Sequence, residues 1–198
     1  MELYENENEN RDYLFSKLNG NPELTSKNYL MGKEISVPYK QIYIPVRKSL
    51  EIWCFKQDIC VYHKLFDESI DGNNIFLNSE GKNIIKVILE RNGGKGDVGM
   101  PFLIMETKMA NADTHSLLAA SEKIKMIKTI FPYCKAFLLI FGSPLPRAFR
   151  HCLDFDEISY IVDLNDESCN GIIKKIIYWT IVASSYLPYI AESKHNYI

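Results

Sequence analysis

The distribution of apolar and polar residues divides the chain into an early part with short alternating runs and a later part with helical spacing. β-Branched and aromatic residues fill 41–46, 51–55 and 59–62, and polar triplets at 47–49 and 56–58 separate these runs. Runs of this kind, bounded by polar turns, predict a small antiparallel sheet. Its aromatic residues, among them Tyr43, Trp53 and Tyr62, would either pack in the core, which is the commoner case, or stack on nucleic-acid bases.

Helical spacing marks four other segments. A short helix is predicted around 13–18, and Ser79 is a fitting N-cap for a helix over 79–91 with apolar residues at 84, 85, 88 and 89. A third helix is predicted over 114–131, capped by Asp113 or Thr114, and a last one over 166–185.

Three further runs read as strands. Residues 102–108 are apolar up to a charged end, 135–141 form a continuous apolar run typical of a fully buried strand, and 158–162 fit an edge strand. Because a helix separates 102–108 from 135–141, the order predicts a parallel crossover.

The charged end of the first of these strands is the strongest chemical signal in the sequence. Side chains alternate between the two faces of a strand, so Glu106 and Lys108 leave the same face of an otherwise hydrophobic strand. Charged groups in such a place need partners or a ligand. Eight residues, which include a Gly-Met-Pro turn, separate Asp97 from Glu106, and a tight hairpin would bring the Asp97 carboxylate to the same spot.

Two carboxylates that converge with a lysine favour a hard divalent cation. Magnesium binds few protein carboxylates and shares its remaining positions with water and phosphate oxygens. The lysine would then orient an attacking water or offset the charge that builds on a phosphate. The alternative is an internally paired, solvated Glu-x-Lys without chemistry.

The pattern Asp97, then Glu106-Thr107-Lys108 at a strand end, resembles the PD-(D/E)xK nuclease superfamily, which has the restriction-endonuclease-like fold. Gly96 stands where the family pattern has proline. The resemblance implies that Asp97, Glu106 and Lys108 are catalytic in the Mg²⁺-dependent hydrolysis of a DNA phosphodiester, with Mn²⁺ able to substitute. It also implies metal ligation by Asp97, Glu106 and the backbone carbonyl of Thr107.

The resemblance covers 80–141 and implies an α/β (mixed α+β) fold, in which helices flank a central mixed sheet. We expect one nuclease domain over 1–198, with an N-terminal extension and antiparallel sheet at 1–79, the catalytic core at 80–141, and a C-terminal strand and helix at 142–198. In the family, a helix precedes the metal-binding hairpin, and some members supply an extra carboxylate from it. Glu90 is the weak candidate for that carboxylate here.

Basic residues near this core are weak candidates for contacts with the DNA backbone. They are Lys95, Lys125, Lys128, Arg147 and Arg150. The expected substrate is double-stranded DNA, cut by a homodimer of the type II restriction kind, because two strands are cut and each protomer offers one site. A structure-specific or repair nuclease, and a non-catalytic DNA- or protein-binding module on the same fold, are the alternatives.

Composition modifies this picture only slightly. The chain of 198 residues has a net charge of −2, which counts modestly against nucleic-acid binding, although local basic patches matter more than the sum. Its five cysteines are scattered and include no Cys-x-x-Cys pair, so we expect reduced thiols in a cytoplasmic protein. The apolar stretch 172–190 is interrupted by Lys174 and Lys175, which predicts a buried helix and no membrane span.

Overall fold

The computed structural model describes residues 2–26, 29–47, 49–63, 69–70, 86–91, 94–98 and 101–186. Within these ranges it gives only the backbone for 41, 43–44, 47, 49–52, 63, 69–70, 86–91 and 94–98. The helices are α1 (Glu7–Leu18), α2 (Pro22–Thr25), α3 (Thr114–Ile130), α4 (Pro146–His151) and α5 (Asp166–Ser184). The strands are β1 (Tyr29–Ile44), β2 (Ser49–His63), β3 (Ser69–Ile70), β4 (Lys86–Arg91), β5 (Gly94–Val98), β6 (Leu103–Met109), β7 (Lys135–Phe141) and β8 (Glu157–Ile161).

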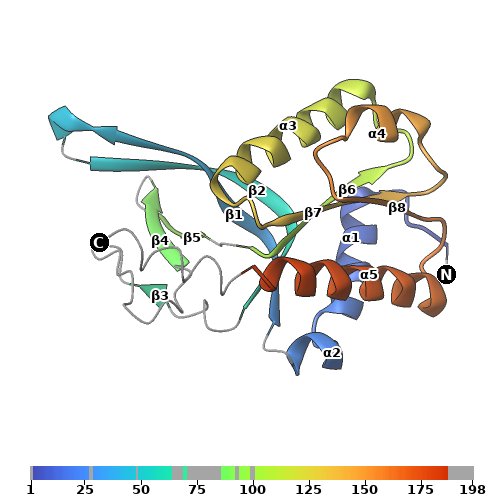
Figure 1. The fold of residues 1–198 in the computed structure, drawn as a ribbon. Coiled ribbons are helices and arrows are strands. Elements are labelled where there is room, and N and C mark those ends of the chain that lie inside the picture. The colour runs from blue at the N-terminus through green and yellow to red at the C-terminus, as the bar shows by residue number, and fades with distance from the viewer. Residues whose placement is uncertain are drawn as a thin grey trace.

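The strands of the described residues form one mixed sheet in the order β3-β4-β5-β1-β2-β6-β7-β8. β1 and β2 form a long antiparallel hairpin, β2 continues antiparallel into β6, and β6, β7 and β8 run parallel. Helix α3 makes the crossover from β6 to β7, so the predicted parallel crossover is confirmed. The fold is therefore a mixed α/β fold with helices on both faces of a mixed sheet, as Figure 1 shows.

Alternation along the buried strands explains the two helical layers. In β7, Phe137, Leu139 and Phe141 face a core shared with α1, α2 and α5. Ala136, Leu138 and Ile140 face a second core shared with α3 and α4. A central strand that is apolar on both faces needs cover on both sides, which is why the run 135–141 has no polar alternation.

Several local predictions are confirmed. The helix predicted over 114–131 is α3, capped by Asp113, whose side chain accepts a hydrogen bond from the Ser116 N–H at 2.7 Å. β8 is the edge strand and α5 the last helix, with Ile172, Ile173, Ile176 and Ile177 buried on one side. Within the described residues, no helix is long and apolar enough to cross a membrane.

Two predictions for the first half are wrong. Residues 86–91 are strand β4 rather than the end of a helix, and they pair antiparallel with β5; residues 79–85 lie outside the described part of the chain. The predicted turn at 56–58 lies inside strand β2, which runs unbroken from Ser49 to His63. As a result, β1 and β2 are not a separate small sheet, because β2 pairs with β6 in the main one.

Candidate active site at the fork between β2 and β6

The site lies where β2 and β6 part. Their ladder joins Val61, Cys60 and Ile59 to Leu103, Ile104 and Met105, and Asp58 and Glu106 are the next residues on the two strands. Beyond this point β2 continues into the outer half of the hairpin while β6 runs toward the body of the protein (Figure 1). A fork of this kind leaves backbone groups without ladder partners, and side chains take their place.

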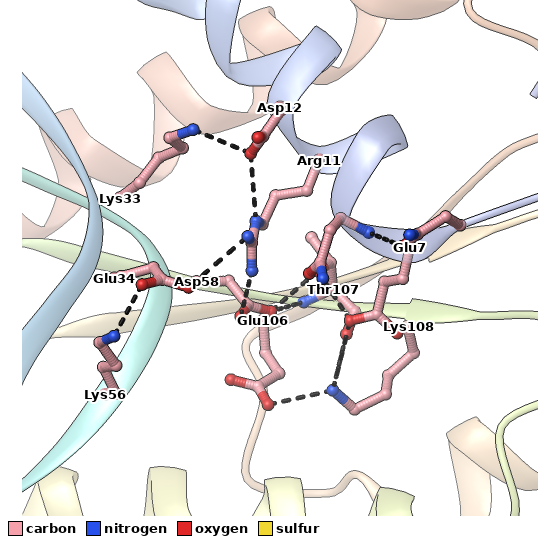
Figure 2. A network of polar contacts seen from close by, with 12 residues as sticks. Glu7, Arg11, Asp12, Lys33, Glu34, Lys56, Asp58, Glu106, Thr107 and Lys108 are labelled. Carbon is pink, nitrogen blue, oxygen red and sulfur yellow. Dashed lines mark hydrogen bonds and ion pairs between the residues drawn. The ribbon is translucent and has the colours of Figure 1, made fainter. Parts of the chain in front are cut away.

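Asp58 closes the end of the ladder with its side chain. Its Oδ2 accepts hydrogen bonds from the backbone N–H of Thr107 at 2.7 Å and from the Thr107 hydroxyl at 2.8 Å. Its Oδ1 accepts from the Arg11 guanidinium at 3.2 Å. Both oxygens of Asp58 are therefore oriented by groups on β6 and α1, as Figure 2 shows.

Glu106 is the most buried acid of the site, with 4% of the residue exposed. Its Oε1 is 3.1 Å from Nζ of Lys108 and 3.2 Å from Nζ of Lys123, which comes from α3. Two ammonium groups on a single oxygen offset the cost of burying this charge. No described residue donates a hydrogen bond to Oε2 of Glu106, so that oxygen remains available to a ligand.

Lys108 lies at the centre of the acids. Its Nζ donates to the backbone carbonyl of Thr107 at 2.7 Å and lies 3.9 Å from Oε1 of Glu7 on α1. Burial lowers the pKa of Lys108, but the nearby carboxylates of Glu106, Glu7 and Asp58 outweigh it, and the pKa lies above its usual value. Lys108 is therefore an ammonium at neutral pH.

Glu7 adds a third carboxylate from the first turn of α1. The Thr107 hydroxyl lies 3.2 Å from its Oε1. Burial raises the pKa of Glu7, Lys108 opposes that effect, and the negative charges of Asp58 and Glu106 add to it, so the pKa is raised overall. A carboxyl group whose pKa is raised by burial and by neighbouring acids is typical of functional sites.

The structure brings together only part of the predicted site. Glu106, Thr107 and Lys108 converge on β6 as predicted, but the hairpin expected between Asp97 and Glu106 is not formed, because β1 and β2 lie between β5 and β6. Three strand spacings of about 4.8 Å place the two backbones roughly 14 Å apart. The side chain of Asp97 is outside the described part of the structure, and its catalytic role stays a prediction.

The remaining predicted residues fall in several places. Glu90 lies in strand β4 rather than in the helix expected to carry it, and its register partner on β5 is Lys95. Lys125 lies beside Glu122 on the exposed side of α3, whereas Lys128 is held by Asp156. Arg147 and Arg150 are in α4, and Arg150 is exposed.

Four residues of this site were missed by the sequence analysis. They are Glu7, Arg11, Asp58 and Lys123. Arg11 is buried and forms ion pairs with Asp58 at 3.2 Å, with Asp12 at 3.6 Å and with Glu34 at 3.7 Å. The available signal was the acid Asp58 between two apolar strand segments, since a charge inside a strand needs a partner there just as Glu106 does.

Among the described residues, no group of three or more His, Cys, Asp or Glu side chains is placed to hold a metal ion. The oxygen groups that meet around Thr107 are the carboxylate of Asp58, which accepts from its N–H, and the carboxylate of Glu106, which shares the Lys108 ammonium with its carbonyl. A search of protein-family models found none that matches the chain, and a search of curated proteins found no similar sequence.

Proposed function

We propose that this chain is a magnesium-dependent endonuclease of the PD-(D/E)xK type that cleaves double-stranded DNA, and that Asp58 rather than Asp97 is the acid that works with Glu106 and Lys108. The observation that carries the proposal is the fork itself. The acid Asp58, at the point where β2 leaves the ladder with β6, bonds to the backbone of a Glu-x-Lys near the end of β6, and α3 leads from there into the buried parallel strand β7.

The order of the elements supports the same assignment. In the resembled family, a helix precedes the metal-binding hairpin, and a helix and a buried strand follow it. Here α1 precedes the β1–β2 hairpin, while α3 and β7 follow β6. The helix that supplies an extra carboxylate would then be α1 through Glu7, which takes the place predicted for Glu90. This arrangement supports the finer assignment of a restriction-endonuclease-like fold.

The donor set suits magnesium. Carboxylate and carbonyl oxygens are its preferred protein ligands, and one or two carboxylates are enough. Nζ of Lys108 already lies 3.1 Å from Glu106 Oε1 and 2.7 Å from the Thr107 carbonyl, so these two oxygens stabilise a positive charge. Glu106, Asp58 and the Thr107 carbonyl would hold Mg²⁺, which when bound supplies Lewis-acid polarisation of the phosphate and a more acidic water.

The chain's own groups do the rest. Lys108 and Lys123 present two ammonium groups next to Glu106 and would donate hydrogen bonds to the scissile phosphate as its charge increases. Arg11 and the Thr107 N–H fix the orientation of Asp58 and are positioning groups. Two such protomers related by a two-fold axis would cut both strands.

The decisive experiment compares two asparagine variants, Asp58→Asn and Asp97→Asn, in the purified full chain. Supercoiled plasmid and phage DNA are incubated with Mg²⁺ or with chelator, and binding of Mg²⁺ and Mn²⁺ is measured by calorimetry. We expect Mg²⁺-dependent cleavage that is lost in Asp58→Asn and retained in Asp97→Asn. Loss only in Asp97→Asn would return the catalytic role to Asp97, and wild-type protein that neither cleaves nor binds either metal would refute the nuclease.

One observation favours a second candidate, a non-catalytic DNA- or protein-binding module on the same fold. Glu106 is already paired with two lysines of its own chain, which is what an internally neutralised relic site would show. The two candidates differ in calorimetry, because the module binds no divalent cation at Glu106 and its duplex affinity is unchanged by chelator.

A further inference from the structure

The outer half of the β1–β2 hairpin forms an arm, which we define as residues 40–54. β1 and β2 have 16 and 15 residues, against the five or six that are usual for a strand. In the described sheet, Lys40 to Ile44 pair only with Ser49 to Trp53. Figure 1 shows this part of the hairpin extending away from the helices.

The arm presents apolar and basic groups to solvent. Val46, in the turn at its tip, is 96% exposed, and Trp53 is 48% exposed. Lys40 is the cross-strand partner of Trp53, and its Nζ lies 5.7 Å from the centre of the indole ring. Exposed apolar and aromatic groups on a projecting ribbon bury little of their surface within the fold, so they make the arm a candidate contact surface for a partner.

The charge of the arm indicates the partner. Residues 40–54 contain the basic residues Lys40, Arg47 and Lys48 and a single acid, Glu51, whereas the whole chain has a net charge of −2. The arm therefore has the opposite sign to the rest of the molecule and suits a polyanion. A two-stranded β-ribbon also has the width that the major groove of B-DNA admits.

We propose that the arm lies along duplex DNA beside the fork and holds it there through Lys40, Trp53 and the tip at Val46. This inference rests on the proposed nuclease function and adds the surface that binds the substrate. In this arrangement Lys40 contacts a phosphate, and the Trp53 ring packs against the sugar and base edges of the groove wall.

The continuity of β2 sets the reach of the arm. Trp53 precedes Asp58 by five residues and Ser49 precedes it by nine on the same strand. At about 3.3 Å per residue these separations are roughly 17 and 30 Å. One base pair of B-DNA rises about 3.4 Å, so contacts extend to about five to nine base pairs from the cut phosphate on one side.

The two tryptophans of the chain, Trp53 and Trp179, provide a direct test. In Trp179→Phe the emission comes from the arm, and in Trp53→Phe it comes from α5, where the Trp179 indole donates to Glu157. A 30-base-pair mixed-sequence duplex is added without divalent metal, so that no cleavage occurs. Binding is followed separately by anisotropy of a fluorescein-labelled copy of the same duplex.

We expect the duplex to quench Trp53 emission and shield it from acrylamide, with no change in Trp179 emission. Duplex binding that leaves Trp53 unchanged would overturn the arm while leaving the nuclease intact. An absence of duplex binding would also overturn it, and plasmid cleavage would then decide the nuclease separately. Shielding of Trp53 that grows with protein concentration in the absence of DNA would instead assign the arm to a second copy of this chain.

A lysine pair gives a second readout in the wild-type tryptophan background. Lys40→Ala removes one proposed phosphate contact, so the slope of log affinity against log salt should fall in magnitude by about 0.9. The matched control is Lys174→Ala on the exposed side of α5, which should leave the slope unchanged. Equal slopes for wild type and Lys40→Ala would contradict the phosphate contact.

Discussion

The buried Glu106 and the half-buried Asp156 are each contacted by two lysines, and the two carboxylates differ in what their oxygens do. Asp156 accepts from Lys135 on Oδ1 at 3.1 Å, and from Lys128 and the Ala136 N–H on Oδ2 at 2.7 and 2.8 Å. Glu106 has both of its lysines on Oε1. Asp156 therefore uses both of its oxygens to join α3, β7 and the start of β8. In its contacts with described residues Glu106 uses only Oε1, so its Oε2 is available to a ligand. Charge pairing alone therefore does not distinguish Glu106 from Asp156, whereas the Glu106 oxygen that accepts no hydrogen bond from a described residue does.

The largest effect is expected for Glu106→Gln. Removal of this charge should reduce Mg²⁺-dependent plasmid cleavage by about a thousandfold, since a metal ligand is worth several kcal/mol of transition-state stabilisation. The free energy of unfolding in urea should fall by less than it does in Asp156→Asn, because the change also relieves the repulsion between Glu106 and Glu7, and Glu7 remains 3.9 Å from Lys108. If Glu106→Gln lost much stability but kept full cleavage activity, Glu106 rather than Asp156 would be the structural carboxylate.

The converse is expected for Asp156→Asn. The change leaves Lys128 and Lys135 without their carboxylate and should lower the free energy of unfolding by about 3 kcal/mol. Cleavage per folded molecule should be unchanged. Urea unfolding and plasmid cleavage, measured on the same preparation, give both quantities. A loss of cleavage without a loss of stability in Asp156→Asn would show that the carboxylates of Asp156 and Glu106 do not differ in role.

A matched lysine pair on α3 sharpens the comparison further. Lys123→Met removes an ammonium from Glu106 and should slow cleavage about tenfold, equivalent to about 1.4 kcal/mol. Lys128→Met removes the partner of Asp156 and of the Asp154 carbonyl, 2.6 Å away, and should cost about 2 kcal/mol of stability without affecting cleavage. Identical profiles for the two variants would mean that the lysines of α3 have one common role.

The smallest effect concerns acid pH. Burial raises the pKa of Asp156, but its hydrogen bonds from Lys128 and Ala136 outweigh this, and the pKa lies below the ordinary value of 3.8. A depressed folded-state pKa adds stability that is complete above the unfolded pKa and is lost as the pH falls through the folded one. The unfolding free energies of wild type and Asp156→Asn should therefore converge below about pH 4. A constant difference down to pH 2 would contradict this linkage.

The local parts of the fold were predictable because their signals lie within single segments. The apolar run of β7 and the capped periodicity of α3 specify their own structure, and the crossover between them follows from connection rules. The charged end of β6 was likewise predictable, because Glu106 and Lys108 stand two residues apart in an apolar strand.

The partner acid was not predictable in this way. Lys56, Gln57 and Asp58 form a polar triplet that reads as a turn, but Gln57 is buried and the triplet continues β2. What makes the triplet a strand is its pairing with β1, where Lys56 faces Ser36, and such a register depends on residues far away in the sequence. The helix predicted around 13–18 begins earlier, at Glu7, and this residue acquires its role only against Thr107.

β4 shows the limit of periodicity. Its Ile88 and Leu89, together with residues 84 and 85, fit the apolar face of a helix, but they fit the centre of a strand as well. Pairing with β5 decides the outcome for residues 87–91. The pattern around Asp97 was therefore assigned to the wrong hairpin.

The hydrogen bond between Thr107 and Glu7 joins residues 100 positions apart, and this separation bears on biosynthesis. A nascent chain that has exposed α1 and β2 but not β6 has two of the acids and neither lysine of the cluster. The three carboxylates meet only after β6 has been made and has docked against β2 and α1. Under the proposed function, a fragment that stops before β6 would lack Glu106 and Lys108 and would have no hydrolytic site.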